Sequence, residues 1–276
     1  ARPQHMTHPP TFFTQVGDLR VAYRVFGQGA PILLIMGLTG TLELWDPTLV
    51  AALARHSLVV AFDNRGMGET ANTGDYPFEQ IADDAACLIE VLGLEAPTVL
   101  GWSTGGSIAL DLAVRHPERV GRLVLYAGDC GGPEVVHPSP AVEAQFGDTS
   151  GTPAEQRERL IRVLFPPGWR ERHAAYVKRV FYSELRASTP ENLTRQAQAL
   201  AGWAGVGPRL ATVQRPALIV QGMADIVTPP ENAQVLAAGL SGSWLVRMAG
   251  AGHGLMYQYP RQLARLVRLF SRLPEG

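Results

Sequence analysis

Short apolar runs alternate with amphipathic stretches along most of this sequence. The runs have the length and character of strands; they cover residues 31–37, 57–63, 97–102, 122–128, 216–222 and 243–250. Residues 31–37 and 57–63 are expected to be buried on both faces of a sheet. Apolar residues recur at helical spacing directly after residue 103 and at about 45–55, 78–92, 231–239 and 260–272. The stretch 11–27 reads as two further strands joined at Gly17-Asp18, a hairpin signal. This alternation predicts an α/β fold: a mostly parallel eight-stranded sheet with helices on both faces.

One long stretch breaks the alternation. Residues 133–210 hold no strand-like run, carry several helical patterns and contain many aromatic side chains. We therefore expect a core made of residues 11–132 and 211–276, with a helical cap inserted at 133–210. The alternative is that these helices pack on the outside of the core without forming a cap.

Size and charge narrow the class of protein. The chain has 276 residues, 46% of them hydrophobic, which fits one large domain or a domain with an insertion. No apolar run reaches the ~18 residues of a membrane span, and no signal-peptide pattern is visible. We expect a cytoplasmic protein, and we interpret residues 1–6 as a leader segment whose last residue, Met6, is the natural start. The net charge of −1 and the scattered arginines argue against nucleic acid or a membrane as the main partner.

The two cysteines, Cys87 and Cys130, lack a Cys-x-x-Cys spacing and have no histidine close by in the sequence. We expect buried free thiols; the alternative is a disulfide, which needs a geometry that the sequence does not supply. The sequence also lacks the Gly-Lys-Ser/Thr of a phosphate-binding loop. No metal and no cofactor are therefore expected.

A glycine-rich turn at residues 101–106 carries one serine. Gly101, Ser103 and Gly105 form a Gly-x-Ser-x-Gly pattern between an apolar run and an amphipathic stretch. At a strand-to-helix turn of this kind, a strained backbone lifts the serine hydroxyl beyond the sheet edge, and glycines prevent collisions with the neighbouring strand and helix. The pattern predicts a nucleophilic serine. The alternative is a turn whose serine only caps the helix.

A serine hydroxyl needs a base to take its proton and an acid to orient that base. His253 lies in a glycine-rich loop directly after the last predicted strand, and loops at strand carboxyl ends form the site of an open α/β sheet. His253 is therefore the predicted base. The remaining histidines lie near the N-terminus, at helix ends or in the insertion; they are His5, His8, His56, His116, His137 and His173.

Two aspartates compete for the role of the acid. Asp225 comes three residues after Gly222, at the end of one predicted strand, and Asp129 ends the strand that follows Ser103. An aspartate at either strand end could reach the histidine. We favour Asp225, and we interpret Asp129 as a residue that lines the mouth of the site or serves the structure.

Together with the predicted serine, acid and base, the sequence resembles the α/β-hydrolases over nearly its full length. The order Ser103, Asp225, His253 matches the order of the triad in that family. Residues 62–70 are similar to the family's structural Asp-x-Arg-Gly-x-Gly-x-Ser segment, with Thr70 in place of the usual serine. The resemblance implies the α/β-hydrolase fold and acyl transfer to water.

One departure from the family concerns the loop after the third strand. Family members commonly have His-Gly there, whereas this chain has Met36-Gly37 followed by Leu38. The oxyanion hole of the family uses backbone N–H groups, so the missing imidazole need not abolish it. By position, the resemblance implies that the amides of Leu38 and Thr104 are the donors.

The resemblance implies a serine hydrolase that cleaves a carboxylic ester or a lactone through an acyl-enzyme on Ser103. The expected partner is this small molecule, and a homo-oligomer stays open. We expect Trp102, Phe181 and Trp203 in the substrate pocket. The alternatives are a small-molecule sensor or regulator on the same fold, a haloperoxidase-like or perhydrolase-like activity, and a C–C bond hydrolase. Epoxide hydrolases and haloalkane dehalogenases of this fold use an aspartate nucleophile, so the serine argues against both.

Overall fold

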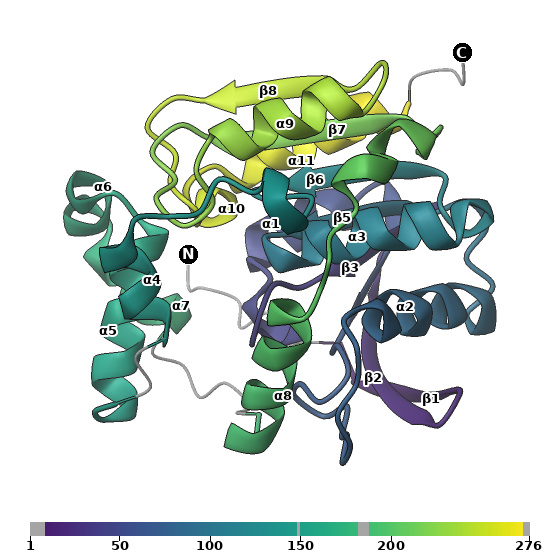
Figure 1. The fold of residues 1–276 in the computed structure, drawn as a ribbon, viewed down its shortest axis with the longest axis horizontal. Helices are drawn as coiled ribbons and strands as arrows, with labels where there is room; N and C mark the ends of the chain where they lie inside the picture. Colours follow the sequence, from purple (N-terminus) through teal and green to yellow (C-terminus); the bar gives the residue numbers. More distant parts are fainter. Residues whose placement is uncertain (1–8, 148–149, 182–187, 273–276) are drawn as a thin grey trace, which may run out of the picture.

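The computed structural model describes residues 9–147, 150–181 and 188–272. Its strands form one eight-stranded sheet in the order β1-β2-β4-β3-β5-β6-β7-β8 (Figure 1). The pairs β1–β2 and β2–β4 are antiparallel, and the other pairs are parallel. The strands are β1 (Phe12–Val16), β2 (Leu19–Phe26), β3 (Ala30–Ile35), β4 (Ser57–Phe62), β5 (Thr98–Trp102), β6 (Arg122–Tyr126), β7 (Ala217–Gly222) and β8 (Trp244–Met248). The predicted sheet is confirmed, and the leader expected at residues 1–6 lies outside the described ranges.

Helices cover both faces of the sheet and enclose two apolar cores. α2 (Glu79–Val91), α3 (Thr104–Arg115) and α9 (Glu231–Gly239) pack on one face, and α1 (Pro47–Ala54), α10 (Leu255–Gln258) and α11 (Pro260–Ser271) pack on the other. On β3, Leu33 and Ile35 belong to the first core, whereas Ile32 and Leu34 belong to the second. Because side chains alternate between the faces of a strand, covering both faces requires the continuous apolar runs seen in the sequence.

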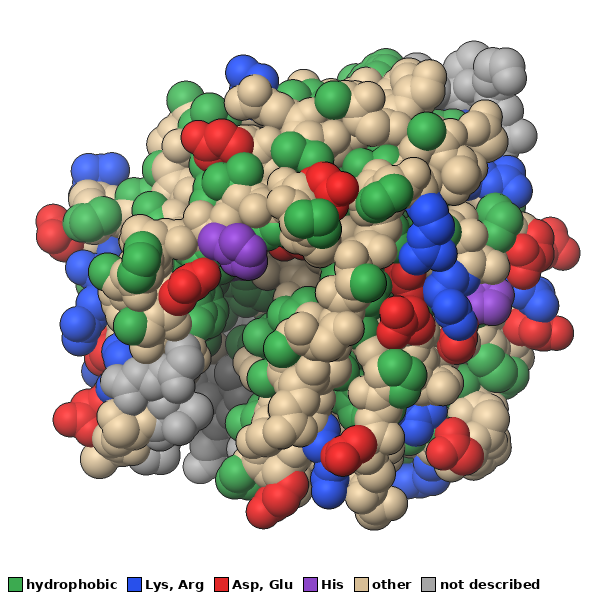
Figure 2. All heavy atoms as spheres, viewed as in Figure 1, with side chains coloured by type: hydrophobic (Ala, Val, Ile, Leu, Met, Phe, Trp, Pro, Cys, Tyr) green, Lys and Arg blue, Asp and Glu red, His purple; other side chains and the backbone are tan. Residues whose placement is uncertain are grey.

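The described part of the stretch between β6 and β7 is helical. It contains α4 (Pro140–Gly147), α5 (Pro153–Leu164), α6 (Pro167–Arg172), α7 (Ala174–Phe181) and α8 (Pro190–Ala201), flanked by the short 3₁₀ helices η3 (Gly132–Glu134) and η4 (Gly207–Thr212). Figure 1 shows α4 to α7 as one group on the side to which the arrow of β8 points, with α8 apart from them. The surface is hollowed between that group and α8 (Figure 2). We call residues 133–210 the helical insertion, and its role as a separate cap stays a prediction.

The insertion contacts the core through aromatic rings and several hydrogen bonds. Phe165, which ends α5, and Phe181, which ends α7, pack against Tyr257 of α10, with ring centroids 5.8 and 5.0 Å away. Tyr176 of α7 donates its hydroxyl proton to the buried carboxylate of Asp46, the residue that caps α1. These contacts hold α5 and α7 against the face of the sheet that α1 covers.

The loop at residues 62–70 is tied into the core by hydrogen bonds. Asp63 accepts two backbone N–H groups, at 2.7 and 2.9 Å. Thr70, at the last position of the motif that this loop resembles, accepts the Ala22 N–H through Oγ1 at 2.9 Å. A hydroxyl is what this position needs, so threonine can serve here as well as serine.

The two cysteines are free thiols, as predicted, with Cys130 buried and Cys87 partly buried. In the part of the chain that the structure describes, no helix combines the length and the apolar character needed to cross a membrane.

Candidate active site

Ser103 sits on the turn that joins β5 to α3, where its backbone is left-handed, with φ of 57° and ψ of −127°. A Cβ added to Gly101 would lie 2.1 Å from the carbonyl oxygen of Gly105, and one added to Gly105 would lie 2.1 Å from that of Ile35. Only glycine fits at these two positions, which is the physical reason for the sequence pattern. The Ser103 N–H donates to the Tyr126 carbonyl of β6 at 2.8 Å. The strained turn is therefore held at the sheet edge, as in a nucleophile elbow.

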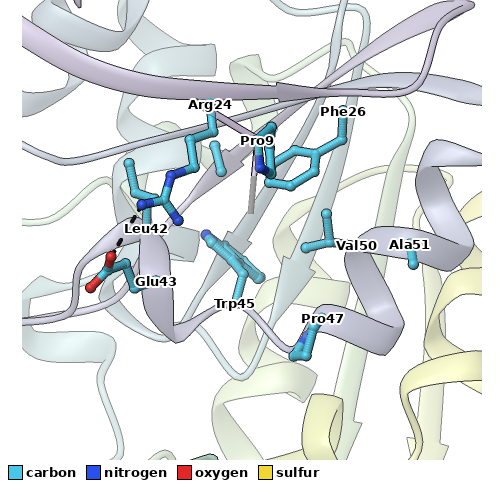
Figure 3. A pocket seen from close by; sticks show the side chains of 10 residues that line it. Pro9, Arg24, Phe26, Leu42, Glu43, Trp45, Pro47, Val50 and Ala51 are labelled. Carbon is cyan, nitrogen blue, oxygen red and sulfur yellow. Dashed lines mark hydrogen bonds and ion pairs between the residues drawn. The ribbon is translucent and has the colours of Figure 1, made fainter. Parts of the chain in front are cut away.

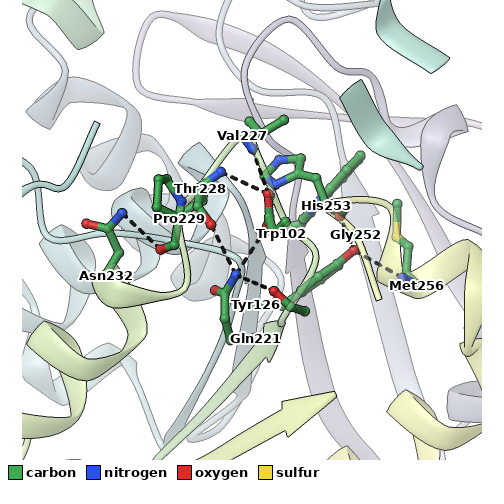
Figure 4. Close-up of polar contacts among 12 residues, drawn as sticks. Trp102, Tyr126, Gln221, Val227, Thr228, Pro229, Asn232, Gly252, His253 and Met256 are labelled. Atoms are coloured by element: carbon green, nitrogen blue, oxygen red, sulfur yellow. Dashed lines mark hydrogen bonds and ion pairs between the residues drawn. The ribbon is translucent and has the colours of Figure 1, made fainter. Parts of the chain in front are cut away.

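His253 and Asp225 form a buried hydrogen-bonded pair, with Nδ1 of His253 2.9 Å from Oδ2 of Asp225. Oδ1 of Asp225 accepts the N–H groups of Val227 and Thr228, each at 2.9 Å. Gln221 Nε2 donates to Oδ2 at 3.3 Å (Figure 4). These donors fix the direction of the carboxylate. Because Asp225 binds Nδ1, Nε2 of His253 is the atom that can take a proton.

The carbonyl of His253 is anchored to the strand ends beside the serine turn. Trp102 Nε1 donates to it at 3.1 Å, and the Tyr126 hydroxyl also donates to it (Figure 4). The Met256 N–H in turn donates to the Tyr126 hydroxyl at 3.1 Å. The last residues of β5 and β6 therefore position the histidine loop. The Trp102 side chain therefore contacts the histidine loop. That it also lines the substrate pocket stays a prediction.

The insertion reaches the other side of the histidine loop. The Gly254 N–H donates to the Leu164 carbonyl at the end of α5, at 2.8 Å. A Cβ added to Gly254 would lie 2.5 Å from the Phe165 ring. The end of α5 therefore packs directly on the backbone next to His253, and glycine is required for this close approach.

One link of the expected triad is open. In the part of the chain that the structure describes, Ser103 Oγ makes no hydrogen bond to His253, although Asp225 and His253 are joined. Contacts of this kind commonly tighten only when a substrate is bound. The structure therefore brings the predicted acid and base together and fixes the serine turn beside their loop.

The loop after β3 lies against the serine turn. A Cβ added to Gly37 would be 3.1 Å from Cβ of Ser103. Within the described residues, the N–H groups of Leu38 and Thr104 donate to no other group, so both stay available as the predicted oxyanion donors. The assignment itself remains a prediction.

Two side chains that the sequence analysis did not single out hold this loop. Asn64 Nδ2 donates to the Met36 carbonyl at 3.0 Å, and Gln196 of α8 accepts the Thr39 N–H. The absence of the family's histidine signalled only that some other bracing was needed. No local pattern connects Gln196 with a loop more than 150 residues earlier in the chain.

Asp129 follows β6, as the sequence indicated, but its carboxylate faces its own loop. Oδ1 accepts the Gly131 N–H at 2.9 Å and lies 3.4 Å from Ser107 Oγ of α3. Burial raises the pKa of Asp129, and the hydrogen bond from Gly131 opposes this in part. Because His253 Nδ1 is bonded to Asp225, the geometry favours Asp225 as the acid.

The two predicted pocket residues of the insertion lie in different surroundings. Phe181 packs among Phe165 and Tyr257, the rings that adjoin the histidine loop. Trp203 packs on Phe78 of the α2 segment, with ring centroids 4.4 Å apart, in the core that α2 and α3 cover. The surroundings favour Phe181 over Trp203 as a pocket residue, and both assignments stay predictions.

Cavities of about 150 and 260 Å³ lie elsewhere on the protein. The smaller lies between β2, α1 and the 3₁₀ helix η1 (Leu42–Leu44), and the ion pair of Arg24 and Glu43, 3.1 Å apart, lines it (Figure 3). The larger lies between the start of α2 and α8. Neither cavity is lined by Ser103, Asp225 or His253, so neither belongs to the candidate site.

A family model described as the alpha/beta hydrolase fold matches residues 30–260. The chain belongs to this family. It is similar to the putative carbamate hydrolase RutD of Azorhizobium caulinodans, with 27% identity over 86% of this chain and 89% of that protein. The family match and this relative support a hydrolase.

Solved structures agree on the fold. An alpha/beta hydrolase fold protein from Chitinophaga pinensis aligns with a TM-score of 0.84 and 26% identity, over 97% of this chain and 98% of that one. The enol-lactonase from Burkholderia xenovorans LB400 aligns with a TM-score of 0.79 and 24% identity, over 95% and 100%. At this identity the second likeness shows a shared fold alone.

Proposed function

We propose that the protein is a serine hydrolase that cleaves a carboxylic ester or a lactone through an acyl-enzyme on Ser103. The observation that carries the proposal is the buried hydrogen bond between His253 and Asp225, anchored by strand ends next to the strained serine turn. A serine becomes a useful nucleophile only with such an oriented base beside it. Acyl transfer is the chemistry that this set of groups can perform.

In the first half of the reaction, Ser103 Oγ attacks the carbonyl carbon while His253 Nε2 takes its proton. Asp225 keeps Nδ1 protonated and stabilises the imidazolium that forms. The Leu38 and Thr104 amides stabilise the negative charge on the carbonyl oxygen. The tetrahedral intermediate then collapses: the bond to the leaving oxygen breaks, that oxygen takes the proton from His253, and the acyl group stays on Ser103.

In the second half, a water molecule takes the place of Ser103 as the nucleophile and attacks the acyl-enzyme. His253 takes a proton from the water as its oxygen attacks the acyl carbon. The second intermediate collapses, Ser103 Oγ regains the proton, and a carboxylic acid leaves. For a lactone, the alcohol and the acid are two ends of one product.

A substrate panel tests the substrate class. Carbamates are the competing class, because the RutD relatives bear that name and a carbamate presents a comparable carbonyl carbon. We expect sustained turnover of p-nitrophenyl esters or of lactones, with kcat/KM above that for matched aryl carbamates. Release of about one equivalent of p-nitrophenol followed by arrest would instead favour a sensor.

The first prediction concerns the nucleophile. Ser103→Ala should lower kcat by about 10⁶-fold, because the serine and its base act as one unit. A fluorophosphonate should label Ser103 alone, as peptide mapping of the modified protein would show. Ser107→Ala is the matched control, since this serine lies on α3 and bonds to the Asp129 loop. Labelling of another serine, or an active Ser103→Ala variant, would overturn the assignment.

A further inference from the structure

α8 places a polar face on the loops that follow β3 and β4. Its buried residues are Asn192, Gln196 and Ala199, so two of the three carry a side-chain amide. Asn192 lies over the tight turn at Gly66, where an added Cβ would be 3.1 Å from its Cγ. A helix packed for stability alone would bury apolar side chains on this face. The buried amides therefore need a reason of their own.

Among the described residues, Gln196 makes one side-chain hydrogen bond, and its amide nitrogen has no partner. Oε1 accepts the Thr39 N–H at 2.5 Å. The side chain is 1% exposed, and among the described residues Nε2 has no partner. A buried donor without a partner costs at least as much free energy as one hydrogen bond contributes. Gln196 is therefore a poor stabiliser of the fold.

The hydrogen bond falls on a strained residue next to a predicted oxyanion donor. Thr39 has a φ of 61°, a left-handed conformation that β-branched residues rarely adopt. Its N–H belongs to the peptide that directly follows Leu38. The loop is held from its other end by the bond from Asn64 to the Met36 carbonyl. Relaxing the Thr39 backbone would break the bond to Gln196 and turn the adjoining peptides.

We infer that Gln196 is a positioning residue for the oxyanion hole. By accepting the Thr39 N–H, it holds the loop so that the Leu38 N–H faces the charge that develops when Ser103 attacks. The inference rests on the proposed function. It also connects α8, which borders the hollow in Figure 2, with the stabilisation of the transition state.

The test compares Gln196→Leu with Gln198→Leu. Leucine has a similar volume but no acceptor, and Gln198 is an exposed glutamine of the same helix. Four quantities are measured: kcat and KM for the ester that the wild type cleaves fastest, the rate at which a fluorophosphonate labels Ser103, and the melting temperature. For Gln196→Leu we expect kcat to fall about 10–100-fold, somewhat less than the loss of a direct oxyanion donor. KM should change less than about threefold, because the contact acts only on developing charge. Gln198→Leu should match the wild type in all four.

Labelling and melting separate this role from a structural one. The labelling rate should fall with kcat, since phosphonylation also develops charge on oxygen, whereas the melting temperature should not fall. An unchanged kcat, or a loss of kcat that accompanies a lower melting temperature, would overturn the inference alone. A wild type that is neither labelled at Ser103 nor active on any ester would overturn the proposed function, and this inference with it.

Discussion

The carboxyl edge of the sheet and the helical insertion beside it are held in shape by different contacts. At the edge, each functional residue is fixed by at least one hydrogen bond that involves a backbone atom. The Ser103 N–H bonds to a β6 carbonyl, Asp225 accepts two backbone N–H groups, and the His253 carbonyl accepts from Trp102 and Tyr126. Backbone contacts of this kind tolerate little displacement.

The insertion is positioned mainly by side chains. The Phe165 and Phe181 rings pack on Tyr257, and the Tyr176 hydroxyl bonds to Asp46. We expect exchanges of these side chains to move the sheet edge less than changes within the edge itself. Under the proposed function, the reacting groups lie at the edge, and we assign the choice of substrate to the insertion. Gln196 is the exception, because we infer that it connects the insertion with the oxyanion hole.

The largest expected effect within this comparison is at the edge itself. Asp225→Asn should lower kcat by about 10⁴-fold while the protein stays folded, because the amide favours the wrong tautomer of His253. Steady-state kinetics together with circular dichroism would check both parts of this expectation.

Asp129→Asn is the matched control, since this aspartate ends the neighbouring strand but bonds to its own loop. It should change kcat by less than about tenfold, in line with an exchange away from the triad. If Asp129→Asn lowered kcat more than Asp225→Asn, the acid would be Asp129, and the assignment of Asp225 would be wrong.

Most of the sheet edge could be predicted from the sequence, because its features repeat rules of local geometry. Gly101 and Gly105 are required by close backbone approaches, and loops after parallel strands meet at one edge. The sequence does not distinguish Asp225 from Asp129 as clearly. Both follow a strand, and only the direction of each carboxylate, set by N–H groups within its own loop, separates them.

The insertion could be predicted less well. Its helical character follows from apolar spacing, but which residues it buries against the core depends on packing between distant segments. Trp203 contacts Phe78, and Gln196 contacts Thr39, across more than 120 residues of chain in each case. No periodic pattern encodes such pairs, so the sequence indicated aromatic residues without showing which of them adjoin the histidine loop.

A chain-length series tests whether the insertion selects the substrate. Each CH₂ that an apolar wall buries contributes roughly 0.8 kcal/mol, so two added carbons should raise kcat/KM by up to about tenfold until the pocket is full. Phe181→Ala should move the optimum to longer chains, since this ring packs among those next to the histidine loop. The measurement is kcat/KM for p-nitrophenyl esters from acetate to laurate.

Trp203→Ala serves as the comparison variant in this series. Because Trp203 packs on Phe78 in the core, its truncation should lower the free energy of unfolding by about 3–5 kcal/mol and leave the optimum in place. A shift with Trp203→Ala and none with Phe181→Ala would reverse the roles. An optimum that responds to neither would mean that these residues do not set the pocket.

The smallest expected effect concerns the hydrogen bond that joins the insertion to α1. Burial raises the pKa of Asp46, and the hydrogen bond from Tyr176 lowers it in part. Tyr176→Phe removes that donor, so the buried carboxylate is less well satisfied and its pKa rises further. The free energy of unfolding should fall by about 1–3 kcal/mol at pH 8, where Asp46 is ionised.

The sign of the pH dependence follows from the raised pKa. The folded state holds a proton on Asp46 at pH values where the unfolded state has lost it. The free energy of unfolding therefore rises as pH falls through the raised pKa of the folded state toward 3.8, the ordinary pKa of an aspartate. The cost of Tyr176→Phe should therefore shrink as the carboxyl becomes protonated. Urea unfolding at pH 8 and at about pH 4.5 measures this, with Tyr259→Phe as the control, because within the described residues that hydroxyl has no hydrogen-bond partner. A cost that is equal at both pH values, or larger in acid, would show that the bond to an ionised Asp46 does not hold the insertion to the core.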